Sequence, residues 1–486
     1  MQPIDETQKI SFKAIIKANY FIALTLLSFY INACGGSNSS SQNLNIDSSL
    51  ILKTPVNNTF QRGKIINPVY CQSDPTKSYA LYIPDDNSNQ PLPVVYLFDP
   101  HGDGLLPVKK YKALADSFHF ILAGSNDSKN GNDWNDAESI WSALNEDIQK
   151  RVAVNPDRIY LCGFSGGAKV ATFIALHHAC ISGLIANGAG LEDITSAGNF
   201  NFSFTAIAGN GDMNMTDLVS IDNILDKTST RHRIIFFDGI HEWAPETTMN
   251  TAFEGLQFDA MRKNLIPRDT AFIDKFISKN QKIIADNETK NDFLKAEEIC
   301  RLAAGMLDGV TEKAGWFNQI EDSITHTNAY QKQEQARQNL LQKEEKIKSG
   351  FQQNFQTDDN TYWDKTIADV KSKATAKTPE GAMYQRLQAY LSLAFYSISN
   401  QLINQNQNKE AEHFVSLYKK ADPTNSEAWY FSAILNARNN NAKDATDDLL
   451  KAVSLGFNDK KRLDQQSEFS NGQTKINLEK IESKMK

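Results

Sequence analysis

The chain has 486 residues, a formal net charge of −7 and a pI near 5.7, with 41% hydrophobic and 22% charged residues. This length exceeds one ordinary domain and predicts two or three globular domains. The acidic balance excludes the basic footprint of a nucleic-acid-binding protein, and the lack of an apolar run of 18 or more residues argues against a permanent transmembrane helix.

The N-terminal residues have the pattern of a secretory targeting segment. Lysines precede the apolar stretch 20–31, and a small residue then precedes Cys34. A basic region, a short apolar core and a small residue before the cut are typical of a cleaved signal. The ending Ile-Asn-Ala-Cys resembles a bacterial lipobox, which implies removal of residues 1–33 and lipid attachment to Cys34, although Asn32 departs from the usual small residue. A plain signal peptide is the alternative.

The lipobox resemblance implies a protein of the bacterial cell envelope, at the periplasm or the cell surface, with its membrane contact through the lipid. Residues 34–49 are rich in Ser, Asn and Gly and predict a flexible tether. Four further cysteines have irregular spacing without C-x-x-C, so neither zinc nor a disulfide framework is indicated. They are Cys71, Cys162, Cys180 and Cys300. We expect them to be small buried residues, and any disulfide pairing stays open.

The predicted α/β domain spans residues 50–267, and within it the chain from residue 79 to about 261 alternates between short apolar runs and helical stretches. The strand-like runs are SYALYIP, PVVYLFDP, FHFILAGS, RIYLCGF, GLIANGAG, FTAIAGNG and RIIFFDG. Amphipathic helical segments separate several of them, including 137–152, 166–179 and 246–261. Strands that are apolar nearly throughout and alternate with helices predict an α/β fold whose mainly parallel sheet is covered on both faces.

The chain after residue 267 has a different character. Strand signals end there, and polar helical patterns continue to the C-terminus, with a long solvated helix expected over 327–355. Four residue pairs are 34 apart, the period of the tetratricopeptide (TPR) repeat: Phe395 and Trp429, Ser399 and Ala433, Ala411 and Ala445, Val415 and Leu449. The prediction is a helical linker at 268–379, TPR-like helices at 380–460 and a polar tail at 461–486. An irregular helical bundle is the alternative, because two units alone are recognisable.

The segment Gly163-Phe164-Ser165-Gly166-Gly167 reads G-x-S-x-G and lies between an apolar strand and a helical run. This strand–turn–helix context is what a nucleophile elbow requires. The elbow holds its serine in a strained conformation, and the outer glycines let the strand and the helix approach closely. Ser165 is therefore the predicted nucleophile; a structural glycine turn is the alternative.

A serine at its ordinary pKa is a weak nucleophile and needs a base. Active residues of such sheets lie beyond the carboxyl ends of the strands, which decides among the eight histidines. Seven have other expected places: the start of a strand (His119, His232), the end of the helix after Ser165 (His177, His178), the helical region (His326, His413) and an early loop (His101). His241 follows the last strand directly and is the predicted base.

A carboxylate should orient the imidazole of His241 and stabilise its charged form. Asp212 lies just past the carboxyl end of the strand 204–208, and the order Ser, Asp, His is that of the α/β-hydrolases. The rivals are Asp193, which follows an earlier strand, Asp217, and Asp238, which is too near His241 along the chain. Asp212 is therefore the predicted third member.

The oxyanion of a tetrahedral intermediate needs preorganised hydrogen-bond donors. Gly166 supplies the N–H directly after the nucleophile, at a helix N-terminus whose dipole favours negative charge. The second donor is expected from the N–H of Gly102 or Asp103, within an H-G-x-G sequence after the strand 94–98. His101 is expected to position this loop.

Together these motifs resemble the α/β-hydrolase superfamily, and within it the small secreted esterases related to polyhydroxybutyrate depolymerases, feruloyl and acetylxylan esterases and dienelactone hydrolases. The motifs are N-P-D-R-I-Y-L-x-G-F-S-G-G at 155–167, G-x-x-D at 209–212 and G-x-H-x-W-x-P at 239–245. The resemblance covers about residues 70–265. It implies an α/β-hydrolase sheet with Ser165, Asp212 and His241 as the triad. The family has H-G directly at the strand end, whereas Asp99-Pro100 intervenes here.

The resulting expectation is a lipid-anchored serine hydrolase that cleaves a small-molecule or polymer-linked carboxylic ester through an acyl-enzyme. No cofactor is implied, and no third ligand near His101 and Asp103 completes a metal site. Trp243 is a candidate substrate contact, with Trp134 and Trp141 as weaker ones. The TPR-like helices predict a protein partner. A non-catalytic interaction protein with a retained hydrolase scaffold and a serine peptidase on the same fold are the alternatives.

Overall fold

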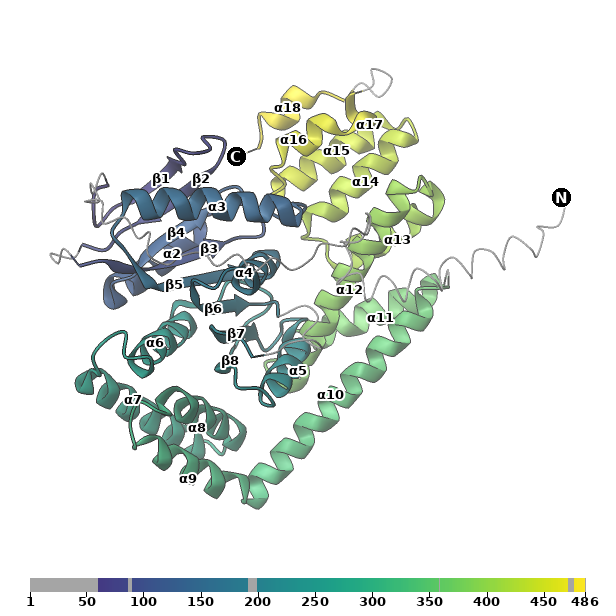
Figure 1. The fold of residues 1–486 in the computed structure, drawn as a ribbon. Helices are drawn as coiled ribbons and strands as arrows, with labels where there is room; N and C mark the ends of the chain where they lie inside the picture. The colour runs from purple at the N-terminus through teal and green to yellow at the C-terminus, as the bar shows by residue number, and fades with distance from the viewer. Residues whose placement is uncertain (1–59, 86–89, 191–198, 358, 471–475, 486) are drawn as a thin grey trace, which may run out of the picture. The chain divides into compact units, whose positions relative to one another are not determined.

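The computed structural model describes residues 60–85, 90–190, 199–357, 359–470 and 476–485. The chain divides into two compact units between Gln338 and Asn339. The described residues up to 338 are the sheet unit, and those from 339 onward are the helical unit (Figure 1). Cys34, the signal 1–33 and the tether 34–49 lie outside the described residues. Within the described ranges, no helix combines the length and apolarity needed to cross a membrane.

The sheet unit contains an eight-stranded sheet with the order β1-β2-β4-β3-β5-β6-β7-β8. The strands are β1 (Ile65–Tyr70), β2 (Ser78–Tyr82), β3 (Leu92–Phe98), β4 (Ile121–Ser125), β5 (Val154–Phe164), β6 (Ile181–Asn187), β7 (Ser203–Gly209) and β8 (His232–Phe237). β1 and β2 pair antiparallel with their neighbours, and β3 to β8 run parallel. This topology confirms the expected α/β fold with a mainly parallel sheet.

β1 is the strand that the apolar pattern did not indicate. It lies at the edge of the sheet, and Val69 is its one buried residue. Its pairing with β2 is irregular between Ile66 and Val69, where Pro68 lacks an N–H for the ladder. A short edge strand that is mostly exposed has little need of apolar side chains, so its sequence resembles a loop.

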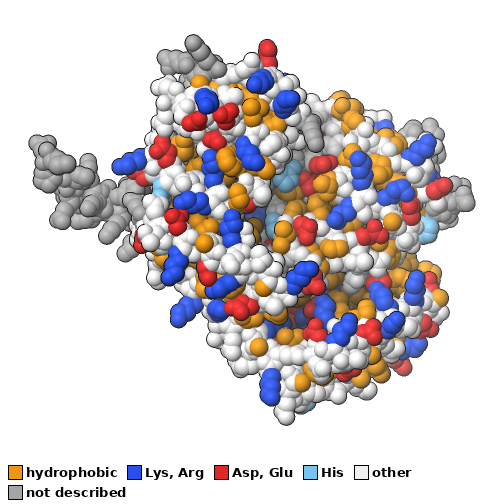
Figure 2. Space-filling view, turned by 180° about the vertical axis from the view of Figure 1, so that it is seen from behind, with side chains coloured by type: hydrophobic (Ala, Val, Ile, Leu, Met, Phe, Trp, Pro, Cys, Tyr) orange, Lys and Arg blue, Asp and Glu red, His pale blue; other side chains and the backbone are white. Residues whose placement is uncertain are grey.

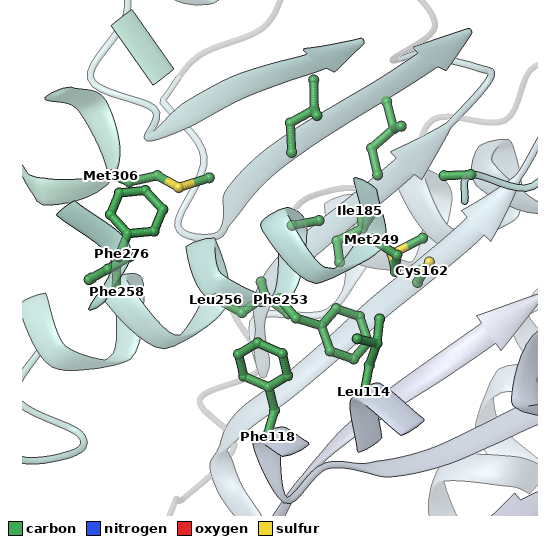
Figure 3. Packing of buried hydrophobic residues seen from close by; sticks show 14 of the residues in the cluster. Leu114, Phe118, Cys162, Ile185, Met249, Phe253, Leu256, Phe258, Phe276 and Met306 are labelled. Atoms are coloured by element: carbon green, nitrogen blue, oxygen red, sulfur yellow. The ribbon is translucent and has the colours of Figure 1, made fainter. Parts of the chain in front are cut away.

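Each face of the sheet is buried under its own helices. Residues of α2 (Leu105–Phe118) and α6 (Glu246–Arg262) form one core, and residues of α3 (Trp134–Arg151), α4 (Gly166–His177) and α5 (Met215–Leu225) form the other. Side chains of a strand alternate between faces: Val95 and Leu97 belong to the first core, and Val94 and Tyr96 to the second. In the first core, Phe118 of α2 lies beside Phe253 of α6 (Figure 3).

Three further helices extend the first core: α7 (Thr270–Thr289), α8 (Phe293–Leu307) and α9 (Ala314–Thr325). Phe276 of α7 packs against Phe258 of α6 with ring centroids 4.8 Å apart, and Met306 of α8 lies nearby (Figure 3). Arg262 donates hydrogen bonds to the carbonyls of Met306 and Asp308 at 2.7 and 2.6 Å. The boundary expected at 267 therefore moves to 338, because these amphipathic helices cover the sheet unit and are not a linker.

The helical unit begins at Asn339, inside α10 (Asn328–Asn354), which is the long polar helix expected over 327–355. Its other helices are α11 (Asn360–Lys373), α12 (Pro379–Asn404), α13 (Asn408–Ala421), α14 (Ser426–Arg438), α15 (Ala442–Ser454), α16 (Lys460–Gln465), α17 (Ser467–Ser470) and α18 (Leu478–Glu482). The expected polar tail 461–486 is partly a packed element, because Leu463, Phe469 and Ile481 are buried in the core of this unit. Their wide spacing concealed that role in the sequence.

Two helical hairpins, α12–α13 and α14–α15, repeat at the predicted period of 34 residues. Asn406 and Asn440 are 34 apart and each lies two residues beyond the end of the first helix of its hairpin, and both have φ of 56°. Asparagine tolerates this left-handed conformation better than most residues. The four predicted pairs occupy equivalent places in the two hairpins, with Ala411 and Ala445 both fully buried. The identification as TPR repeats and the protein partner stay predictions.

The four cysteines beyond residue 70 are unpaired in the structure. Cys71, Cys162 and Cys300 are buried, and Cys180 is exposed. Burial raises the pKa of Cys71 and of Cys300 to about 12, so these thiols stay protonated. On the face drawn in Figure 2, positive and negative side chains are interspersed and are not sorted into patches of one sign.

Candidate functional site

The turn between β5 and α4 has the geometry of a nucleophile elbow. Ser165 is the N-cap of α4, with φ 51° and ψ −120°, a strained conformation for a residue with a side chain. A Cβ at Gly163 would lie 2.2 Å from the carbonyl oxygen of Gly167, and one at Gly167 would lie 1.9 Å from that of Phe98. Both motif glycines are therefore required by close backbone contacts.

Ser165, His241 and Asp212 form one hydrogen-bonded series. The Oγ of Ser165 lies 2.9 Å from Nε2 of His241, and Nδ1 of His241 lies 3.0 Å from both carboxylate oxygens of Asp212. With the proton on Nδ1, the imidazole donates to Asp212 and its Nε2 accepts from the serine hydroxyl. Asp212 is fully buried, whereas the side chain of His241 is 20% exposed. The structure brings the three predicted residues together.

The sheet explains why residues so distant in sequence meet. Ser165 directly follows β5, Asp212 follows β7, and His241 follows β8, all at the carboxyl ends of parallel strands. In the register, Phe164 of β5 is level with Asn187 of β6, and Gly209 of β7 is level with Phe237 of β8. The three loops therefore leave the sheet on the same side, at the carboxyl ends of the parallel strands.

The rival residues have other surroundings. Asp238 accepts a hydrogen bond from the side chain of Asn210 at 2.8 Å, and Asp217 lies in the first turn of α5. Asp193 lies outside the described residues. Nε2 of His232 lies 3.1 Å from the carboxylate of Asp226, and His232 is the first residue of β8, so it is at the amino ends of the parallel strands, away from Ser165. These positions leave Asp212 and His241 as the partners of Ser165.

Asn187 is a site residue that sequence reasoning missed. It ends β6 and is fully buried, and its carbonyl accepts from the N–H of Ser165 at 2.9 Å. Its side chain accepts from the N–H of Ala244 at 2.7 Å and donates to the carbonyl of Glu242 at 3.2 Å. Asn187 thus joins the elbow to the loop that carries His241. A polar residue at the end of the apolar run GLIAN was the available signal.

Trp243 is placed in the core, which corrects its expected role as a substrate contact. It is 6% exposed, and its indole N–H donates to Asp99 at 2.8 Å. Its ring packs against Tyr111 and Phe164. The indole therefore fixes the loop after His241 and has no free face for a ligand. Its burial depends on contacts with distant segments, which the motif alone does not reveal.

Asp99 occupies the place where the resembling family has H-G. One carboxylate oxygen accepts from Trp243 and the other from the backbone N–H of His101 at 2.8 Å. Burial raises the pKa of the Asp99 carboxyl, but the hydrogen bonds from His101 and Trp243 outweigh it and leave that pKa below its ordinary value. Asp99 is therefore an ionised anchor that ties the β3–α2 loop to the His241 loop.

The expected oxyanion donors differ in their availability. Gly166 is the first residue of α4, so its N–H has no acceptor within the helix. The N–H of Gly102 donates to the carbonyl of Asp99 at 3.2 Å in a turn where Gly102 has φ of 74°. The carboxylate of Asp103 accepts from the N–H of Leu106 at 3.1 Å. The role predicted for Gly102 is thus opposed by a hydrogen bond within its own loop.

The other two tryptophans lie on α3. Trp141 is 1% exposed, which excludes it from a binding surface. Trp134 is partly exposed and stacks on Phe173 of α4, with ring centroids 4.7 Å apart. Within the described residues, no cluster of three or more His, Cys, Asp and Glu side chains is arranged to hold a metal ion.

Gly188 lies against the pair His241–Asp212, so a side chain at this position should disturb that pair. It has φ of 67°, and a Cβ there would lie 3.0 Å from Oδ2 of Asp212 and 3.1 Å from Nδ1 of His241. We expect Gly188→Ala to slow any reaction at the Ser165 hydroxyl about 10- to 100-fold by displacing the imidazole, and to cost about 1–2 kcal/mol of unfolding free energy. Steady-state kinetics and urea unfolding measure both effects.

The matched control is Gly309→Ala. Gly309 has φ of 70°, but a Cβ there would contact the side chain of Arg262 at an ordinary 3.5 Å, away from the triad. It should lose a similar stability and keep its kcat. Equal kcat losses in the two variants would contradict the crowding argument.

No protein-family model and no curated protein matches the chain. Solved structures resemble its sheet-containing part. The fluorophosphonate-binding serine hydrolase F of Staphylococcus aureus, with substrate bound, has 11% identity and a TM-score of 0.35, and the match covers 40% of this chain and 99% of that one. A hyperthermophilic esterase from the archaeon Pyrobaculum calidifontis has 12% identity and a TM-score of 0.33, and the match covers 42% of this chain and 87% of that esterase. A ferulic acid esterase has 14% identity and a TM-score of 0.33, and the match covers 40% of this chain and 97% of that enzyme.

Proposed function

We propose that the sheet unit is a serine hydrolase that cleaves carboxylic esters through an acyl-enzyme. One observation carries this proposal: Ser165 Oγ lies 2.9 Å from His241 Nε2 while His241 Nδ1 lies 3.0 Å from the buried Asp212. Such an arrangement activates a hydroxyl that is otherwise a weak nucleophile. The strained backbone of Ser165 supports the proposal, because strain of this kind gathers at functional sites.

The proposed reaction uses these atoms in turn. The Oγ of Ser165 attacks the ester carbonyl carbon as its proton moves to Nε2 of His241, and the C=O electron pair moves onto the oxygen. Asp212 holds the imidazole in the required tautomer and stabilises its charged form. Collapse of this intermediate breaks the ester bond, and the alcohol leaves with the proton from His241. Water then attacks the acyl carbon as its proton moves to His241. The bond between the acyl carbon and Ser165 Oγ breaks, and His241 returns the proton to Oγ as the acid leaves.

The oxyanion is stabilised on the side of α4. The N–H of Gly166 is free of any acceptor in its own helix and lies at the positive end of the helix dipole. An ester fits this chemistry better than an amide, because the alkoxide leaves without needing full protonation first. The partial exposure of His241 gives water access for the second half of the reaction.

A fluorophosphonate probe tests the proposal directly. The full-length protein should form a one-to-one adduct, located by peptide mass spectrometry at Ser165, and should hydrolyse p-nitrophenyl acetate. If the native protein neither labels nor turns over aryl or alkyl esters, the non-catalytic interaction protein becomes the better reading. Hydrolysis of peptides but not of esters would favour the peptidase.

The lipid anchor belongs to the same proposal as the place where the enzyme acts. Its support is the sequence pattern that ends at Cys34, which precedes a Ser/Asn/Gly-rich tether. We expect Cys34→Ser to move the protein from the membrane fraction to the soluble envelope fraction, because the lipid attachment point is lost. Metabolic labelling with an alkyne fatty acid measures the loss. Unchanged fractionation with a cleaved signal would instead indicate a plain signal peptide.

A further inference from the structure

Gly166 is a glycine that the elbow itself does not require. The motif leaves this position open, and close backbone contacts occur at Gly163 and Gly167 instead. A Cβ at Gly166 would lie 1.9 Å from Oδ1 and 3.0 Å from Cγ of Asn130, with no backbone atom of another segment among its three nearest neighbours. The space for a side chain beside the nucleophile is therefore filled by the carboxamide of Asn130.

Asn130 comes from the loop between β4 and α3, and backbone contacts hold it in place. Its N–H donates to the carbonyl of Pro100 at 2.8 Å, and His101 and Lys129 form an isolated antiparallel bridge. The N–H of Lys129 donates to the side chain of Asn132 at 2.7 Å, which closes the turn. The loop is thus fastened to the β3–α2 loop by main-chain atoms, and the side chain of Asn130 is left to extend over Gly166.

Most of the N–H groups at the expected place of the second oxyanion donor are already engaged or missing. In the β3–α2 loop, Pro100 has no N–H, the N–H of His101 donates to the Asp99 carboxylate, and that of Gly102 donates to the Asp99 carbonyl. Among the residues that the structure describes, the carboxamide of Asn130 has no hydrogen-bond partner. A side-chain amide beside the first donor can serve the same purpose as a backbone N–H.

We propose that Asn130 is a catalytic residue whose carboxamide N–H is the second donor of the oxyanion hole, beside the N–H of Gly166. The inference rests on the proposed ester hydrolysis by Ser165. In the free protein the carboxamide oxygen is the atom nearer to Gly166. A half turn of the terminal amide exchanges oxygen and nitrogen at nearly constant shape, and a negative oxygen on the substrate favours the orientation that presents Nδ2.

The first test replaces the donor. We expect Asn130→Ala to lower kcat for p-nitrophenyl acetate about 10²- to 10³-fold, with KM changed less than about threefold because the charge develops in the transition state. Asn130→Asp should be at least as slow, since its carboxylate repels the oxyanion. Lys129→Ala removes an exposed neighbouring side chain of the same loop and should keep wild-type kcat and thermal midpoint.

The second test uses the contact between the two loops. Gly166→Ala places a Cβ where the carboxamide lies and should displace it, with a loss of kcat similar to that of Asn130→Ala. In the double variant the displaced group is already gone, so the two losses should not add. Strictly additive losses would overturn the assignment.

The outcomes separate this inference from the proposed function. If the native protein hydrolyses no ester and takes no fluorophosphonate, the proposed function fails first. If the native protein is active and Asn130→Ala stays within twofold of it, the proposed function stands and this inference is wrong, with a backbone N–H such as that of Asp103 as the second donor. A loss in Asn130→Ala that appears only in KM would likewise overturn the oxyanion role.

Discussion

Ser165→Ala should abolish ester hydrolysis, with kcat falling about 10⁶-fold, the scale seen when a triad serine is removed elsewhere. The reason is chemical, because no other hydroxyl lies against His241 in the described site, where Nε2 has the Oγ of Ser165 at 2.9 Å. The fold should persist. Alanine keeps the Cβ that the elbow already accommodates at φ of 51°, and the main-chain hydrogen bond from residue 165 to Asn187 does not use the side chain.

The measurement is p-nitrophenyl acetate hydrolysis beside intact-mass analysis after fluorophosphonate treatment. The matched control is Ser142→Ala, which removes an exposed hydroxyl from the middle of α3. This control should label and turn over like the native protein. Labelling of Ser165→Ala at the native rate would place the nucleophile on a different residue.

Asp212→Asn should lower kcat about 10⁴-fold while the protein keeps its fold. Asp212 is fully buried, its carboxylate lies 3.0 Å from His241 Nδ1, and one oxygen accepts from the N–H of Asn214 at 2.9 Å. An asparagine keeps the second contact through its carbonyl oxygen. Its NH₂ group then faces Nδ1, which favours the imidazole tautomer with the proton on Nε2, and that tautomer cannot accept the serine proton.

Asp238→Asn is the matched control, because Asp238 is the nearest rival in sequence and is exposed, with Asn210 as its partner. Its kcat should stay within about twofold of the native value. The two variants need parallel thermal unfolding curves, so that a kinetic loss is not mistaken for unfolding. A slow Asp238→Asn beside a normal Asp212→Asn would transfer the orienting role to Asp238.

The meeting of Ser165, Asp212 and His241 was predictable because the sequence signals of these residues are local. The elbow is a strand, a turn and a helix that adjoin in sequence, and Gly163 and Gly167 have steric reasons that follow from that turn. Asp212 and His241 could be placed because parallel strands end at one edge of the sheet, so a residue just beyond a strand is near any other such residue. The 34-residue period of the helices was visible for the same reason, as a repetition along the chain.

Predictions about surfaces and boundaries were less accurate, because they depend on what packs against an element. The periodicity of α7–α9 shows an apolar stripe but not that the stripe covers the core of the sheet unit. The wide spacing of Leu463, Phe469 and Ile481 likewise concealed their burial. An aromatic residue such as Trp243, close to the predicted base, is typical of a ligand contact. Its indole N–H instead donates to Asp99, 144 residues away in the chain, and this hydrogen bond holds the ring in the core.

The sequence by itself determined the fold class and predicted which serine, histidine and aspartate meet, because each follows from a pattern within one strand–loop segment and from the shared carboxyl ends of parallel strands. The tertiary structure alone decided how those residues are held and completed. Asn187 joins two loops through a buried carboxamide, and Asn130 reaches over Gly166 from a loop 36 residues earlier in the chain. Contacts between loops depend on side-chain reach and packing across the sheet, which no local spacing encodes.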